Sequence, residues 1–81
     1  MLIENKKLYE ALERALWCSY HTANFIDIHA IYEPDDDGGP HDGRYHAAVD
    51  LYGPGLTYHV YFTKNSENRV TIDSVDRWYM G

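Results

Sequence analysis

Histidine and aspartate residues alternate with apolar residues along much of this chain, and both types can bind metal ions or transfer protons. Asp27 and His29 lie in one alternating segment, Asp50 in a second, His59 in a third and Asp73 in a fourth. Because successive side chains of a β-strand point to opposite faces, we expect these residues to share one face of a sheet. There, His29 and His59 are candidate ligands or acid–base groups, and Asp73 would orient His59.

The same pattern is also typical of a solvated sheet face or of a contact between two copies of the chain. Asp27 and Asp50 are predicted to be neighbours across strands, where two carboxylates repel unless a cation, a proton or a partner's basic group lies between them. Catalysis would need a concave site that excludes water, which an open sheet face does not provide. We therefore assign no catalytic residue, metal ion or cofactor from the sequence. The face residues are binding candidates instead: Asp27, His29, His46, Asp50, His59, Tyr61 and Asp73.

A second set of candidate binding residues lies in the segment 34–43, which contains two prolines, three glycines and four aspartates. This composition predicts an exposed loop that is dispensable for folding. The loop lacks the D-x-D-x-D-G spacing and the following glutamate of a calcium loop. Its carboxylates are predicted to contact a partner: Asp35, Asp36, Asp37 and Asp42.

These residues are positioned by a predicted β-hairpin from Arg44 to Thr63. Two segments rich in β-branched and aromatic residues flank the turn Gly53-Pro54-Gly55. If Leu51 pairs with Leu56, one face of the hairpin is uniformly apolar, whereas a slip of one residue would mix the faces. The apolar set is Tyr45, Ala47, Val49, Leu51, Leu56, Tyr58, Val60 and Phe62.

A helix is predicted over residues 4–20, with Asn5 as a candidate N-cap. Leu8, Leu12 and Leu16 recur at the helical period and form one apolar stripe, which is expected to pack on the apolar face of the hairpin. Cys18 lies among apolar residues, and we expect its thiol to be buried.

Two further strands are predicted, from Phe25 to Glu33 and from Arg69 to Arg77. In the first, the set that includes Ile26, Ile28, Ala30 and Tyr32 is expected to face the helix. Pairing Ala30 with Ala47 and Tyr58 with Ser74 would place His59 opposite Asp73, which predicts a raised His59 pKa. Val75 falls on the wrong side of the alternation, which indicates either a bulge near Ser74 and Val75 or an outer face that is not fully solvated.

The sequence thus predicts the α+β class, with an N-terminal helix packed on a four-stranded antiparallel meander, in a single domain spanning residues 1–81. This order of elements resembles the core of cystatin-like folds, including relatives of the nuclear-transport-factor-2 type. The resemblance covers element order alone, so it implies an architecture and carries no activity.

Composition narrows the classes of partner. The net charge of −6 disfavours direct binding of nucleic acid and favours a protein with a basic surface. A single cysteine excludes an internal disulfide. The sequence lacks the long apolar run of a signal peptide or a membrane span, so neither is predicted. We therefore expect a cytoplasmic location.

The function predicted from the sequence is that of a small acidic, non-enzymatic binding protein that occludes a basic surface of a macromolecular partner. Small acidic domains of this kind often act as inhibitors or adaptors, including phage proteins that block host defence nucleases such as CRISPR effectors. One alternative is a cystatin-like or nuclear-transport-factor-like domain with a small-ligand pocket or active site built on His29, His59 and Asp73. A second is an accessory protein that forms a homodimer through its outer sheet face.

Overall fold

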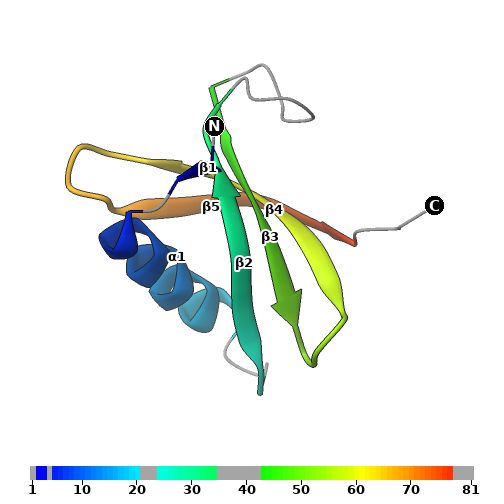
Figure 1. Cartoon of the computed structure of the whole chain (residues 1–81). Helices are drawn as coiled ribbons and strands as arrows, with labels where there is room; N and C mark the ends of the chain where they lie inside the picture. Colours follow the sequence, from blue (N-terminus) through cyan, green and yellow to red (C-terminus); the bar gives the residue numbers. More distant parts are fainter. Residues whose placement is uncertain (1, 4, 21–23, 35–42, 78–81) are drawn as a thin grey trace.

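The computed structural model describes residues 2–3, 5–20, 24–34 and 43–77, and it has one helix and one antiparallel sheet (Figure 1). The strands lie in the sheet in the order in which they occur in the chain, β1-β2-β3-β4-β5. The α+β class and the helix packed on a meander of four long strands are confirmed. The elements are β1 (Leu2–Ile3), α1 (Lys6–Ser19), β2 (Ile26–Tyr32), β3 (Tyr45–Leu51), β4 (Thr57–Lys64) and β5 (Val70–Arg77).

The short strand β1 was not predicted from the sequence. It pairs with the end of β2, where Leu2 lies opposite Tyr32 and Ile3 opposite Ile31. Two residues are too few to show an alternating pattern, so only the tertiary pairing identifies them as a strand. Within the described residues, no helix is both long and apolar enough to span a lipid bilayer.

Helix α1 begins where the sequence predicts, because the Asn5 side chain accepts a hydrogen bond of 3.0 Å from the backbone N–H of Lys7. Leu8, Leu12 and Leu16 are all buried, which confirms the apolar stripe. The prediction of a buried Cys18 is wrong, since this thiol is exposed. Cys18 follows Leu16 by two positions, which turns its side chain to the opposite side of the helix.

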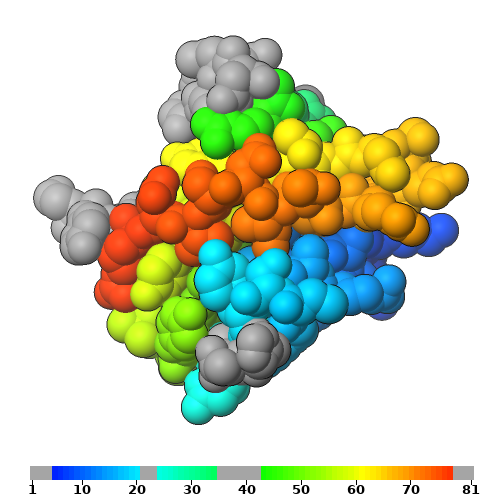
Figure 2. Space-filling model, turned by 180° about the vertical axis from the view of Figure 1, so that it is seen from behind, coloured from blue at the N-terminus to red at the C-terminus, as the bar shows by residue number. Residues whose placement is uncertain are grey.

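The helix lies against one side of the twisted sheet and contacts β2 and β5 (Figure 1). Seen from behind, α1 runs directly beside β5 (Figure 2). The three leucines of α1 join side chains from three strands, β2, β3 and β4, in one buried cluster, so helix and sheet share a core. The strand residues of this cluster are Ile31, Ala47, Val49, Leu51, Val60, Phe62.

The hairpin of β3 and β4 has the predicted register. Tyr45 lies opposite Phe62, Ala47 opposite Val60, and Val49 opposite Tyr58. The Leu51 N–H donates to the Leu56 carbonyl at 3.0 Å, which closes the turn. Tyr52 and Gly55 both have positive φ angles, 72° and 81°, so a glycine supplies one of the two left-handed positions and a tyrosine the other.

A bulge divides β2 and changes the face on which its second half lies. Up to Ile28, which pairs with Val49, the predicted register is correct; beyond the bulge Ala30 pairs with Ala48 instead of Ala47. The expectation that Ala30 and Tyr32 face the helix is therefore wrong, because Ile31 is fully buried in the core. One extra residue in a strand reverses the faces of all that follow it.

The predicted pairing of β4 with β5 is also wrong. Tyr58 lies opposite Arg77, and His59 opposite Asp76. Two causes combine. The first cause is the turn. The side-chain oxygen of Asn65 accepts hydrogen bonds from the N–H groups of Glu67 and Arg69, and the pairs nearest this turn are shifted by two residues from the predicted register. A bulge then adds one residue, at Asp73, between the pairs Phe62–Ile72 and Tyr61–Ser74. Because of this extra residue, Val75 lies opposite the buried Val60 and packs against the core, although a regular alternation would place it on the outer face.

Candidate functional site

The side of the sheet that faces away from α1 carries the predicted polar residues, and we call it the outer face. It contains two groups of interacting side chains. The Asp/His trio consists of Asp27, His29 and Asp50, and the ring cluster consists of Tyr32, His46, His59 and Tyr61. Ala30 and Ala48 pair with each other between the two groups.

The bulge in β2 assembles the Asp/His trio. Asp27 lies directly opposite Asp50, as the sequence predicts. At the bulge, the His29 side chain reaches across to β3, where its Nε2 lies 2.9 Å from Asp50 Oδ1. One ligand atom from each of the three residues lies within 4.8 Å of those of the other two.

The Asp50 carboxylate is fixed in place by its surroundings and is only 5% exposed. Its Oδ2 accepts from the Gly55 N–H at 2.9 Å, and its Oδ1 accepts from the Thr57 hydroxyl at 2.7 Å. Burial alone would raise the pKa of Asp50. The hydrogen bonds from Thr57, Gly55 and His29 outweigh burial and lower this pKa below its ordinary value.

His29 is the histidine that gains a carboxylate partner. Its hydrogen bond to Asp50 is the main cause of a raised His29 pKa, which partial burial opposes and the charges of Asp50 and Asp27 reinforce. The sequence predicted this behaviour for His59. That prediction is wrong, because burial lowers the pKa of His59 and the charge of Asp76 offsets the effect only in part.

The ring cluster is centred on His46. Its imidazole lies 4.9 Å from the Tyr32 ring, 6.0 Å from the His59 ring and 6.1 Å from the Tyr61 ring, measured between centroids. The Arg44 guanidinium lies over the Tyr61 ring, 5.0 Å from its centre. The rings on adjacent strands thus form a continuous layer across β2, β3 and β4.

His46 itself is almost completely enclosed, with 4% of its surface exposed. Among the described residues, neither of its ring nitrogens has a hydrogen-bond partner. Burial is the main cause of a lowered His46 pKa, and the neighbouring His59 contributes to it. Within the described part of the chain, the rings that contact His46 are Tyr32 from β2 and His59 and Tyr61 from β4.

This burial predicts that His46 makes the fold sensitive to acid. Because the pKa of His46 is lower in the folded than in the unfolded chain, the unfolded chain binds the extra proton as the pH falls below about 6.5. Replacing His46 by phenylalanine should therefore raise the free energy of unfolding by about 1 kcal/mol at pH 7. The difference in free energy of unfolding between this variant and the natural protein, measured by urea denaturation, should increase as the pH is lowered from 8 to 5. A gain that is independent of pH would contradict the assignment of His46 as a buried neutral group.

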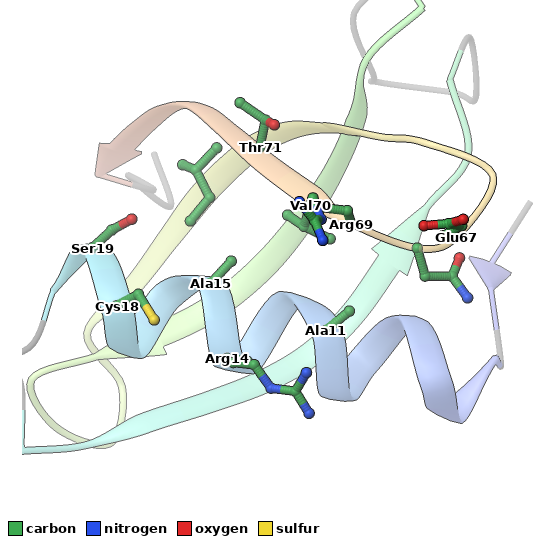
Figure 3. Close-up of a pocket in the computed structure, with 11 residues that line it drawn as sticks. Ala11, Arg14, Ala15, Cys18, Ser19, Glu67, Arg69, Val70 and Thr71 are labelled. Atoms are coloured by element: carbon green, nitrogen blue, oxygen red, sulfur yellow. The ribbon is translucent and has the colours of Figure 1, made fainter.

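Three hollows of the surface are lined by described residues, and the first of them lies away from the ring cluster. It has a volume of about 710 Å³ and lies between α1 and β5, where Ala11 and Ala15 line one side and Val70 and Thr71 the other (Figure 3). A second hollow lies over the exposed side of α1, and a third lies between α1 and β2 and includes Asp27. None of these three hollows is lined by His59, Asp73 or Asp76.

The sequence thus identified most of the polar outer face but not all of its contacts. Asp73, predicted to orient His59, lies at the bulge, and Asp76 takes its place opposite the imidazole. Tyr32 was missed as a member of the ring cluster, because the bulge that turns it outward leaves no mark in the alternation of β2. The predicted binding residues Asp35, Asp36, Asp37 and Asp42 lie outside the described residues.

Comparison with known proteins adds no functional assignment. No protein-family model matches the chain, and no significant match was found among curated proteins or solved structures.

Proposed function

We propose that this protein is a non-enzymatic binding protein that uses its outer face to cover a basic surface of a protein partner. The observation that carries the proposal is the ring cluster. It places two tyrosines and two histidines in one continuous layer on the side of the sheet that the helix leaves uncovered.

The tyrosines of this layer suit an interface. Tyrosine combines a large apolar ring with a hydroxyl, and it is enriched at the centres of protein–protein interfaces. The Tyr61 ring contacts the rings of His46 and His59 and the guanidinium of Arg44. Side chains that are already ordered lose little conformational entropy on binding, which favours affinity.

The charge of the chain suits a basic partner. The net charge is −6, and Asp27, Asp73 and Asp76 are exposed on the strands that border the ring cluster. Carboxylates around an aromatic centre raise the rate of encounter with a basic surface and align the two proteins. In this proposal the aspartates of residues 35–42 also contact the basic partner. The class of activity would be that of an inhibitor or adaptor, as in phage proteins that block host nucleases.

A ligand pocket built on His59 and Asp73 has less support. The β4–β5 register separates these two residues, and none of the three hollows includes His59 in its lining. A small-molecule site normally encloses most of its ligand.

The test is a capture experiment with matched charge variants. The protein is immobilised and exposed to a lysate of the cells that encode it, and bound proteins are quantified by mass spectrometry. We expect the Asp73→Asn/Asp76→Asn variant to retain its partner roughly tenfold less than the natural protein, since two charges at the interface are lost. The control variant Glu10→Gln/Glu13→Gln changes the net charge equally on the exposed side of α1, and it should bind like the natural protein.

Equal retention by both variants would contradict the outer face as the binding surface. Light scattering of the purified protein provides the second measurement. If the chain forms a stable dimer that Tyr61→Ser disrupts while no partner is retained, the outer face is a contact between two copies, and the proposal of a basic partner is wrong.

A further inference from the structure

The Asp/His trio has the composition and arrangement of an open metal site. It combines two carboxylates and one imidazole from two neighbouring strands, and the bulge in β2 brings the imidazole to the carboxylates. Asp27 and Asp50 face each other directly across the strands. No lysine or arginine forms an ion pair with either carboxylate in the described part of the chain, where His29 is the only ion-pair partner of Asp50.

We propose that Asp27, His29 and Asp50 bind a divalent first-row transition-metal ion of the zinc type, with water in the remaining coordination positions. This site goes beyond the sequence analysis, which assigned no metal. It shares Asp27 with the acidic surface of the proposed binding function, but the test of that function uses Asp73 and Asp76 of β5, so each proposal can fail without the other.

The distances within the trio fit such an ion. Zinc is bound by imidazole nitrogen and carboxylate oxygen at about 2.0–2.2 Å and is almost always tetrahedral, so two of its ligands lie roughly 3.4 Å apart. His29 Nε2 and Asp50 Oδ1 are 2.9 Å apart in a hydrogen bond, so the ion would take the place of the shared proton and separate the two atoms by roughly half an ångström. The candidate ligand atom of Asp27 is within 4.8 Å of both, so a rotation of one exposed side chain would complete the set.

Asp50 distinguishes the trio from carboxylates that merely lie close together on a surface. Its side chain is only 6% exposed, and the hydrogen bonds from Gly55 and Thr57 fix the orientation of the carboxylate before any ion binds. Metal ligands in proteins are commonly oriented by hydrogen bonds of this kind. His29 and Asp27 are in contrast exposed, so the ion would remain open to water on one side.

The donor atoms also select the kind of ion. Calcium and magnesium prefer oxygen ligands alone, whereas zinc and its neighbours in the first transition row accept imidazole nitrogen. Two carboxylates and a neutral imidazole carry two negative charges, which balance the charge of a divalent ion. The charge repulsion between Asp27 and Asp50 would then become an attraction of both for the ion.

The experiment is a titration of the full chain with zinc chloride, followed by NMR signals of the individual side chains. Residue-specific signals are needed because the chain has five histidines. We expect saturable binding of one equivalent, with shifts of the His29 imidazole and of the Asp27 and Asp50 carboxylates. Loss of a residue that only hydrogen-bonds to a metal ligand typically weakens metal binding about 10–100-fold. Loss of a ligand itself should weaken zinc binding by at least as much. Both Asp27→Asn and His29→Ala should show this loss.

Asp73→Asn is the matched control, because it removes one exposed carboxylate outside the trio and should bind zinc like the natural protein. Asp27→Asn changes only an exposed side chain, so it remains informative even if His29→Ala unfolds. Shifts confined to His21 or His41, or binding that survives in both trio variants, would overturn the proposal. The proposal would also be overturned if the NMR signals of the trio did not shift with zinc chloride but did shift with butylammonium chloride. The carboxylates would then be a site for a lysine side chain.

Discussion

Replacing Leu16 by alanine is expected to lower the free energy of unfolding by about 2–5 kcal/mol. Leu16 is completely buried, in the same cluster as Val49 and Val60 of the sheet. The shorter side chain would leave a cavity at the contact between helix and sheet. A chain of 81 residues has only modest stability to lose, so much of it should unfold. Urea denaturation followed by circular dichroism measures the loss.

Glu13→Ala is the control for this substitution. Glu13 lies on the exposed side of the same helix, so its truncation should change the free energy of unfolding by less than about 0.5 kcal/mol. If Leu16→Ala also costs less than about 1 kcal/mol, the helix does not form the core contact described above.

Replacing Asp50 by alanine is expected to lower the free energy of unfolding by about 2–4 kcal/mol in the absence of metal. The substitution leaves the Gly55 N–H, the Thr57 hydroxyl and the His29 imidazole without their common acceptor. Asp50→Asn keeps the shape and one acceptor oxygen, so its cost should be smaller. A cost of Asp50→Ala below that of Asp50→Asn would contradict the role of the carboxylate in closing the hairpin turn.

The pH dependence of this cost follows from the two partners. The pKa of Asp50 is lowered in the folded protein, so its contribution is present above the ordinary value of 3.8 and is lost as the pH falls through the lowered pKa. The pKa of His29 is raised, so its contribution is present below the ordinary value of 6.5 and is lost as the pH rises through the raised pKa. The stability difference between the natural protein and Asp50→Ala should therefore be largest between about pH 4 and pH 6.5. A constant difference from pH 3 to pH 9 would contradict the His29–Asp50 pair.

The helix and the central hairpin could be read from the sequence because each is specified by local rules. Leu8, Leu12 and Leu16 recur at the helical period, and all three are buried. The register of β3 with β4 follows from the short turn and from two apolar faces that a slip would mix, and the predicted pairs are those observed. The same alternation correctly placed Asp27 opposite Asp50.

The two bulges were decided by the tertiary structure, and the turn at Asn65 by local hydrogen bonds that the alternating pattern does not reveal. An alternating pattern fixes the face of each residue only while the strand stays regular, and one inserted residue reverses every later face. The bulge in β2 moves Ile31 into the core and Tyr32 to the outer face. The Asn65 turn and the bulge at Asp73 place Asp76, and not Asp73, opposite His59.

The sequence by itself determined the fold class, the helix, the central hairpin and the polar character of the outer face. Which polar groups meet on that face was decided by the tertiary structure. His29 forms an ion pair with Asp50, the pKa of His59 is lowered where the sequence predicted a raised value, and His46 is enclosed by rings from two neighbouring strands. The physical reason is the range of the interactions. Periodicity reports on neighbours along one strand, whereas pairing and burial depend on where side chains of other strands lie once the core has set the registers.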